Sequence, residues 1–261
     1  MVNFKVSPQL KGGLGNFLFQ ISAAYSISLR DNREFIVDVS DLSEGHSSLS
    51  LYYDNIFKKI KFTQNYDNYV VHEPMQPVQY SEVPNPNLNL KLKGYFQNEK
   101  YIKHIRKEIL ELFEIDEITN NYLLEKYSNI LLTENCSIHI RRGDYLKSNG
   151  FHPIQSIEYY KQSISIIGEN VNYLIFSDDI EWCHNNLDFI KNKTYITNNL
   201  DYQDMYLMSM CKNNIIANSS FSWWGAWLNK NNNKVIYPSN WFGVSFLDTS
   251  EIGCDGWLKI K

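Results

Sequence analysis

The sequence SIHIRRGDY at residues 137–145 joins a short apolar strand directly to two arginines, a glycine and an aspartate. Because side chains alternate along a strand, His139 and Arg141 should share one face while Ile138 and Ile140 pack on the other. The glycine allows a sharp turn at the carboxyl end of the strand, where ligands of open α/β sheets bind. This stretch therefore predicts an α/β fold with a ligand site at the end of the strand.

The two adjacent arginines, Arg141 and Arg142, indicate a phosphorylated ligand. A planar guanidinium pairs with two phosphate oxygens at once and keeps its charge at every working pH. Two in succession favour a dianionic or diphosphate ligand. The alternative is that both arginines form ordinary ion pairs with carboxylates such as Asp144.

The composition is that of an ordinary globular protein. The chain has 261 residues, of which 43% are hydrophobic and 21% are charged, enough for one large domain or two smaller ones. A net charge of −4 gives no basic surface for nucleic acid, so no such partner is expected. The cysteines lack the spacing of a metal site and are expected to be reduced packing residues of a cytoplasmic protein: Cys136, Cys183, Cys211 and Cys254.

Local patterns predict alternating strands and helices. The strand, glycine turn and helix at residues 4–29 are typical of a nucleotide-binding half of an α/β fold, and residues 43–92 look irregular. An apolar stripe at residues 101–113 predicts a packing helix. We divide the chain into residues 1–132 and 133–261. Strands are expected at 4–6, 34–39, 137–141, 173–176, 214–217 and 234–237, and helices at 16–29, 101–113, 157–167, 180–185, 201–211 and from about 221.

Polar residues follow two further strands, and in a parallel sheet these ends meet at one edge. Asp178 follows the strand at 173–176 and can accept hydrogen bonds from a base or ribose, while Asp179 is expected to cap the next helix. Ser219 and Ser220 precede a helix that begins near Phe221 and offer hydroxyl and backbone N–H groups to an anion. Simple N-capping by either serine is the alternative. No Asp-x-Asp metal motif occurs at a strand end, so arginine would have to neutralise a departing diphosphate.

Four segments together resemble the bacterial α-1,2-fucosyltransferases of glycosyltransferase family 11: GGLGN at 12–16, GYFQ at 94–97, HIRRGDY at 139–145 and NSSFSWWGAWL at 218–228. They occur in the order of the family and span nearly the whole chain. The resemblance implies a GT-B type α/β fold, in which two Rossmann-like lobes face each other across a cleft. Residues 1–132 would form the acceptor-side lobe and 133–261 the GDP-sugar lobe. One departure is Phe17-Leu18, where the family usually has Gln-Met.

The resemblance also implies the reaction, which is an inverting transfer of L-fucose from GDP-β-L-fucose to the 2-hydroxyl of a galactosyl acceptor. Neither a metal nor a cofactor is expected. Arg141 should contact the β-phosphate, and Asn16 should approach the phosphate and fucose. Asp144 is a third candidate catalytic residue. The expected donor-binding residues are Gly13, Gly15, His139, Arg142, Asp178, Ser219, Ser220 and Phe221, with His139 and Asp178 at the nucleoside.

The proton acceptor for the sugar hydroxyl is not identified by the sequence. Asp144 is one candidate, although bracing Arg142 or the turn is its favoured role, and Arg142 itself lies on the bracing side of the strand. Other candidates are Asp38, Glu44 and His46, and a path with delayed proton loss needs no strong base.

Three alternatives stay open. The donor could be another GDP-sugar such as GDP-mannose, or the protein could be a non-catalytic module that binds glycans or nucleotides. The acceptor glycan is also open. A lipid-linked acceptor would bring this otherwise cytoplasmic protein to the inner membrane.

Overall fold

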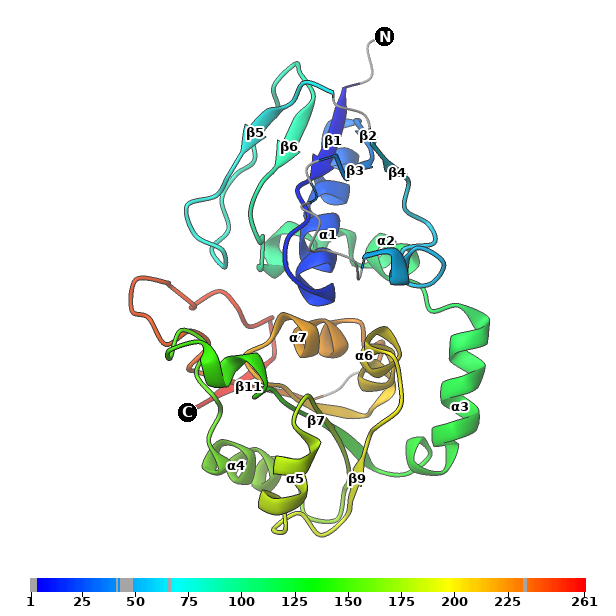
Figure 1. Ribbon diagram of the computed structural model, residues 1–261, viewed down its shortest axis with the longest axis vertical. Coiled ribbons are helices and arrows are strands. Elements are labelled where there is room, and N and C mark those ends of the chain that lie inside the picture. The colour runs from blue at the N-terminus through cyan, green and yellow to red at the C-terminus, as the bar shows by residue number, and fades with distance from the viewer. Residues whose placement is uncertain (1–3, 41, 43–48, 65–66, 232–233) are drawn as a thin grey trace. The chain divides into compact units, whose positions relative to one another are not determined.

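A computed structural model describes residues 4–40, 42, 49–64, 67–231 and 234–261. The chain divides into two compact units, residues 1–115 with 247–252 and residues 116–246 with 253–261 (Figure 1). Residues 116–132, assigned from the sequence to the first lobe, lie in the second unit because their helix contacts that unit. Residues 247–252 belong to the first unit, where the Glu251 carboxylate accepts hydrogen bonds from Tyr80 N and Asn98 Nδ2.

The first unit is built on a parallel sheet with the strand order β2-β1-β6-β5. Helix α1 packs against β1, and a separate parallel pair joins β3 to β4. Short helices complete the unit. Its elements are β1 (Lys5–Pro8), α1 (Leu14–Asp31), β2 (Glu34–Phe35), β3 (Val37–Asp38), η1 (Leu49–Tyr52), β4 (Phe62–Thr63), β5 (Val70–His72), β6 (Leu90–Leu92), η2 (Glu99–Tyr101), η3 (Lys103–Ile105) and α2 (Arg106–Leu112).

Several expectations for this unit are wrong. Residues 43–92 are not wholly irregular, since they contain β4, β5 and β6, and β6 pairs directly with β1. The strand expected at 34–39 divides in two because β2 pairs with β1 while β3 pairs with β4. The helix expected at 101–113 is broken, because Ile102 and Ile105 have φ angles of −130° and −121°. Its apolar stripe is nonetheless a packing face, with Ile109 and Phe113 buried.

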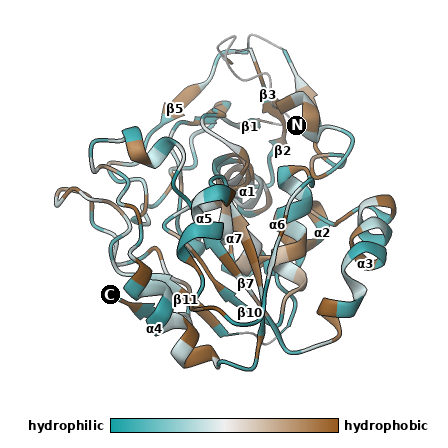
Figure 2. Cartoon of the chain, turned by 60° about the horizontal axis from the view of Figure 1, so that its bottom comes forward, coloured by the Kyte–Doolittle hydropathy of each residue, from teal (hydrophilic) through white to brown (hydrophobic). Residues whose placement is uncertain are grey.

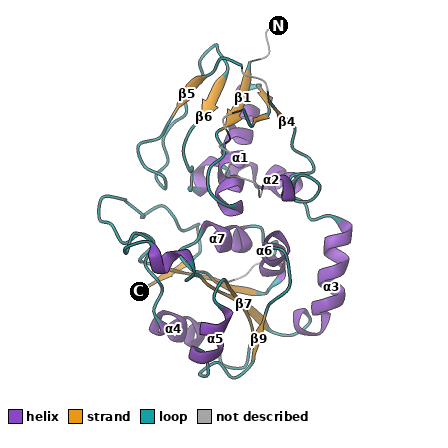
Figure 3. Ribbon diagram, in the orientation of Figure 1, coloured by secondary structure: helices purple, strands orange, loops and turns teal. Residues whose placement is uncertain are grey.

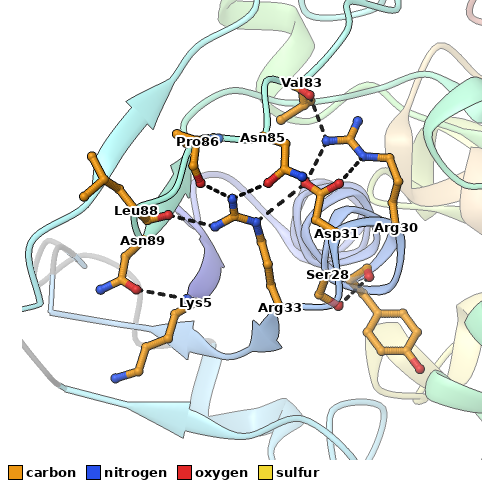
Figure 4. Close-up of polar contacts among 11 residues, drawn as sticks. Lys5, Ser28, Arg30, Asp31, Arg33, Val83, Asn85, Pro86, Leu88 and Asn89 are labelled. Atoms are coloured by element: carbon orange, nitrogen blue, oxygen red, sulfur yellow. Dashed lines mark hydrogen bonds and ion pairs between the residues drawn. The ribbon is translucent and has the colours of Figure 1, made fainter. Parts of the chain in front are cut away.

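Arginines at the end of α1 fasten the chain that leads into β6 (Figure 4). The Arg33 guanidinium donates to the carbonyls of Leu88 and Pro86 and to Asn85 Oδ1, and Arg30 donates to the Val83 carbonyl. These contacts order a segment without regular structure, which explains how the short strand β6 holds its place at the centre of the sheet.

The second unit is built on a six-stranded parallel sheet, with helices α6 and α7 on one side and α4 and α5 on the other (Figures 1 and 3). Its hydrophobic strands stand out around β7 in Figure 2. Helix α3 and strands β9 and β12 were not expected. The elements are α3 (Glu117–Leu131), β7 (Asn135–Ile140), η4 (Asp144–Lys147), α4 (Ile157–Ile167), β8 (Asn172–Ser177), α5 (Ile180–Asn186), β9 (Lys193–Tyr195), α6 (Asp201–Met210), β10 (Asn213–Ile215), α7 (Ser220–Trp227), β11 (Lys234–Pro238) and β12 (Leu258–Ile260).

Candidate functional site

The strand order of the second unit marks the place where a ligand is expected. The order is β12-β11-β10-β7-β8-β9, and every neighbouring pair is parallel. The chain runs outward from β7 to β9, returns to the other side of β7, and runs outward again from β10 to β12. In such doubly wound sheets a crevice forms at the carboxyl ends of the two strands where the direction reverses. The segments at 141–145 and 218–221 follow those two strands, β7 and β10.

Strand β7 has the predicted alternation of side chains. Ile138 and Ile140 pack in the core with residues of α4 and α5, while His139 faces Phe221 of α7 with 5.5 Å between the ring centroids. Burial and the neighbouring Arg141 lower the pKa of His139 to about 3, so its imidazole is neutral. His139 Nδ1 is buried, and no described residue forms a hydrogen bond with it.

Arg141 lies just beyond β7 and is held by two carboxylates. Its Nε is 3.1 Å from Asp178 Oδ2 and 3.0 Å from Asp144 Oδ1, and its Nη2 is 2.9 Å from the same Asp144 oxygen. Nη1 has no acceptor among the residues that the structure describes. The side chain is 35% exposed. Arg141 is thus held in one orientation, and the two N–H bonds of Nη1 have no acceptor among the described residues, an arrangement that suits a phosphate ligand.

Asp178 organises the turn after β7. Its Oδ1 accepts a hydrogen bond from the backbone N–H of Arg142 at 2.9 Å, and its Oδ2 faces Arg141. A Cβ on Gly143 would lie 2.7 Å from Asp178 Oδ2, so only glycine lets the turn approach this carboxylate so closely. Both oxygens of Asp178 are engaged within the protein, which favours a positioning role, and its expected contact with the nucleoside stays a prediction.

Arg142 points away from Arg141 and toward α5. Its Nε is 3.0 Å from Asp179 Oδ2, and its guanidinium lies 4.1 Å from the centroid of the Trp182 ring. Asp179 Oδ1 also accepts from the backbone N–H of Trp182 and so caps α5, as expected. Asp144 was expected to brace Arg142 or the turn; its bracing of Arg142 is wrong, since Asp144 pairs with Arg141, while a role in the turn stays a prediction. The contacts of Arg142 favour bracing over donor binding.

The start of α7 follows β10, the strand on the other side of the reversal of strand order. Ser219 occupies the N-cap position without a capping hydrogen bond from its side chain, and the helix begins at Ser220. The residue before Ser219, Asn218, accepts a hydrogen bond through its carbonyl from the Tyr145 phenol at 2.8 Å. Burial raises the pKa of Tyr145 to about 12. The N-capping alternative is therefore not supported, and the first-turn N–H groups of α7 can meet an anion.

Tyr145 was missed as a site residue. It is the last residue of the motif at 137–145, but its hydrogen bond to the Asn218 carbonyl, beside the start of α7, joins residues 73 positions apart in the sequence. The tryptophans after Ser222 are buried core residues, as their density suggested: Trp223, Trp224 and Trp227.

Gly13, Gly15 and Asn16 lie in the first unit, in the turn between β1 and α1 and at the start of that helix. Gly12 has φ of +93°, and Gly13 is the N-cap. Gln20 Oε1 accepts from Lys11 N at 3.0 Å while Gln20 Nε2 donates to Lys11 O at 3.1 Å, so one side chain fastens the turn. No acidic residue lies in the first helical turn.

Asn16 and Phe17, at the start of α1, contact residues from other parts of the first unit. Asn16 Oδ1 accepts a hydrogen bond from Gln97 Nε2 at 2.8 Å, so that the segments at 12–16 and 94–97 meet. Phe17, where the family usually has glutamine, is fully buried and lies 6.5 Å from the Tyr52 ring. Position 17 is therefore a packing position in this chain.

The candidates for a general base differ in their surroundings. Asp144 is exposed and pairs with Arg141. Asp38 is 3% exposed, its Oδ1 accepts from Ser40 N, and its Oδ2 has no hydrogen-bond partner among the described residues. Glu44 and His46 lie outside the described residues.

In the part of the chain that the structure describes, no group of three or more His, Cys, Asp or Glu side chains could hold a metal ion. All four cysteines are buried, and none of them forms a disulfide. No helix among the described residues is long and apolar enough to cross a membrane.

Known proteins resemble this chain in sequence and in fold. The family model for glycosyl transferase family 11 matches residues 4–261. Two Escherichia coli proteins are each 32% identical to the chain, an O-antigen biosynthesis glycosyltransferase, WbnK (96% of this chain and 99% of that one), and an alpha-1,2-colitosyltransferase (98% and 99%). Among solved structures, the NodZ alpha-1,6-fucosyltransferase from Bradyrhizobium, co-crystallised with GDP, has a TM-score of 0.61 at 10% identity, over 86% of this chain and 92% of that one. This likeness confirms the expected α/β fold of the GT-B type.

Proposed function

The chain belongs to glycosyltransferase family 11, and we propose that it transfers L-fucose from GDP-β-L-fucose to the 2-hydroxyl of a galactosyl acceptor. The transfer would invert the anomeric carbon, form an α-1,2 linkage and need no metal ion or cofactor. The bound GDP of the NodZ structure and the O-antigen role named for the Escherichia coli relative support a nucleotide-sugar donor and a surface-glycan acceptor.

The observation that carries this proposal is the position of Arg141. It lies at the carboxyl end of β7, beside the reversal of strand order, with its Nε and Nη2 held by carboxylates and its Nη1 without an acceptor among the described residues. When GDP departs, negative charge grows on the β-phosphate oxygens. A guanidinium that is already oriented stabilises that charge more than the ground state, and so lowers the barrier.

The first turn of α7 is a second source of positive potential in this unit. The N–H groups that follow Ser219 point out of the helix end, and the partial positive charge there favours phosphate oxygens. His139 stays neutral against Phe221, so it can bind the nucleoside through a hydrogen bond without adding charge. Together these groups would bind and activate the diphosphate by arginine and helix-end charge.

Neither of the two candidate bases that the structure describes is an open carboxylate ready to take the acceptor proton. Asp144 is ion-paired with Arg141, and Asp38 is buried. We infer a transition state with oxocarbenium character, in which the bond to GDP breaks well ahead of proton loss. Such a path places the main catalytic demand on the leaving group, and hence on Arg141.

The name of one relative favours a second candidate donor. The alpha-1,2-colitosyltransferase is as similar to this chain as the O-antigen glycosyltransferase is, at 32% identity. Colitose is fucose without its 3-hydroxyl, so a site that binds one sugar differs from the other by the contacts to a single hydroxyl. A GDP-activated colitose is therefore the alternative donor.

The test is a transfer assay with purified protein, a β-galactoside acceptor and GDP-fucose, GDP-colitose or GDP-mannose, each with and without EDTA. We expect transfer from GDP-fucose that EDTA does not reduce, with the new linkage at the 2-hydroxyl of galactose by NMR. Higher kcat/KM for GDP-colitose would move the assignment to the alternative donor.

Two other results would contradict the proposal itself. Loss of activity with EDTA, restored by a divalent cation, would contradict metal independence. Tight GDP binding without transfer to any acceptor in a panel of galactosides would favour a non-catalytic module. A panel that includes lipid-linked and free saccharides would also test whether the acceptor brings the protein to the inner membrane.

A further inference from the structure

The segment GYFQ at residues 94–97 has no part in the reaction described above, yet its last residue holds Asn16. Gln97 Nε2 donates a hydrogen bond to Asn16 Oδ1 at 2.8 Å. An amide carries an acceptor on one side and two donors on the other. A bond to Oδ1 therefore also fixes the direction in which Asn16 presents its NH₂ group.

That NH₂ group lies at the glycine turn. A Cβ on Gly12 would come within 2.3 Å of Asn16 Nδ2, so the amide lies directly against the backbone of Gly12. Among the described residues nothing accepts a hydrogen bond from Nδ2. The group stands in the first turn of α1, where the partial positive charge of the helix attracts anionic or strongly polar oxygens.

Gln97 is an unfavourable choice for stability at this position. The residue is 8% exposed, and its Oε1 is buried with no hydrogen-bond partner among the described residues. The residue before it, Phe96, has a φ of +52°, in the left-handed region that costs a bulky residue stability. An apolar side chain of similar length would avoid the unpaired acceptor. An amide at position 97 therefore makes the protein less stable than an apolar side chain would.

The backbone around Gln97 is fixed on both sides. Gln97 N donates to the Pro77 carbonyl at 2.8 Å. The next residue, Asn98, donates through Nδ2 to the Val78 carbonyl at 2.8 Å and to Glu251 Oε2 at 2.6 Å. The fixed backbone on both sides limits the positions that the Gln97 amide can take. Gln97 can therefore hold the Asn16 side chain in one orientation.

We propose that Gln97 is a positioning residue: it holds the Asn16 amide so that Nδ2 can donate a hydrogen bond to an oxygen of the nucleotide sugar. The proposal rests on the proposed function. It adds a specific task to a residue that does not itself touch the substrate.

Two substitutions separate this role from a structural one. Gln97→Met removes the N–H donor, keeps the length of the side chain and removes the unpaired oxygen. We expect Tm to stay equal or rise, while kcat/KM for the donor falls about 10-fold to 100-fold because the Asn16 amide is free to turn. Gln97→Glu replaces the donor by a carboxylate that only accepts, so Asn16 must present Oδ1 to the substrate, and we expect at least the same loss.

A double-mutant cycle tests whether Gln97 acts through Asn16. Asn16→Ala alone should lower kcat/KM by about 100-fold, and adding Gln97→Met should lower it no further. Gln79→Met is the matched control, because Gln79 lies in the same unit and bonds only to Asp248 among the partners described. That control should leave kcat/KM within about twofold of the unaltered protein.

The outcomes distinguish failure of the Gln97–Asn16 pairing from failure of the proposed function. If the losses from Asn16→Ala and Gln97→Met multiply while the unaltered protein transfers sugar normally, the pairing is refuted and the proposed function stands. A Gln97→Met variant that keeps full kcat/KM also refutes the pairing. If the unaltered protein transfers no sugar from any donor, the proposed function fails and this inference fails with it.

Discussion

Gly143→Ala is the substitution whose effect follows most directly from the geometry around Arg141. The new Cβ would lie 2.7 Å from Asp178 Oδ2. An ordinary contact between carbon and oxygen is about 3.3 Å, so the carboxylate or the turn must shift by roughly 0.6 Å. The same oxygen is 3.1 Å from Arg141 Nε, and a shift of this size removes one of the two restraints on the guanidinium.

Typical effects of small displacements and of added core atoms give the expected losses in kcat and Tm for Gly143→Ala. A displacement of about 1 Å at a catalytic group costs up to about 100-fold in rate, so we expect kcat to fall by about 10-fold to 100-fold. The clash itself costs about 1–2 kcal/mol, which corresponds to a loss of roughly 2–8 °C in Tm. Activity should therefore fall much more than the folded population at 25 °C.

The assay is steady-state transfer from the nucleotide sugar, with Tm measured on the same samples. Asp178→Ala provides the control, because it removes the oxygen that the new Cβ would meet. On that background Gly143→Ala should change kcat by less than about twofold. Near-normal kcat for Gly143→Ala alone, or an equal loss on both backgrounds, would refute the reasoning.

Three further predictions concern other parts of the chain. Burial raises the pKa of Asp204 to about 6, above its unfolded value, so the stability from its protonated form is present at low pH and lost as pH rises through about 6. Urea denaturation at pH 5 and pH 8 tests this. Asp204→Asn should increase the free energy of unfolding at pH 8 by about 1–3 kcal/mol more than it does at pH 5, and an equal increase at the two pH values would contradict the prediction. Gln20→Leu removes two hydrogen bonds to the backbone of the exposed Lys11 and should lower the free energy of unfolding by about 1–3 kcal/mol, whereas an unchanged Tm would show that the turn does not need these bonds. The imidazole of His139, with a pKa of about 3, should show no protonation by NMR above pH 4.5, and titration near pH 6 would contradict its burial.

Patterns that repeat over several residues were predictable from the sequence. The helix at 157–167 has the bounds that its apolar spacing predicted, and the alternation of Ile138, His139 and Ile140 held in β7. Asp179 caps α5 because a short acceptor before a helix satisfies its free N–H groups, which is a local effect. In each case the physical cause lies within a few residues of the feature.

Elements that depend on distant partners were missed. Strands β4, β5 and β6 are two or three residues long, too short for any periodicity, and they exist because neighbouring strands pair with them. Helix α3 buries only Thr119, Leu123 and Tyr127, so its buried face is narrow and gives a weak signal in the sequence. It is fastened instead by Asn199, whose Oδ1 accepts hydrogen bonds from Tyr122 and Lys126.

The candidate site shows the same division. The residue types at 139–144 indicated a diphosphate ligand, but not which carboxylate holds which arginine. Asp144 and Asp178 bind Arg141, while Arg142 pairs with Asp179, and only the folded turn decides this. The contact of Gln97 with Asn16 spans 81 positions and left no local signal.

The central claim is that Arg141, and not its neighbour Arg142, neutralises the charge of the departing diphosphate. The most direct test is kcat for Arg141→Lys and Arg142→Lys, measured side by side in the presence of EDTA. Lysine keeps the charge but loses the forked geometry, so we expect Arg141→Lys to lower kcat about 100-fold or more with little change in Tm. Arg142→Lys should lower Tm and reduce kcat less than tenfold, because it loses contacts with Asp179 and Trp182 only. Near-normal kcat for Arg141→Lys, or an equal loss in both variants, would contradict the account.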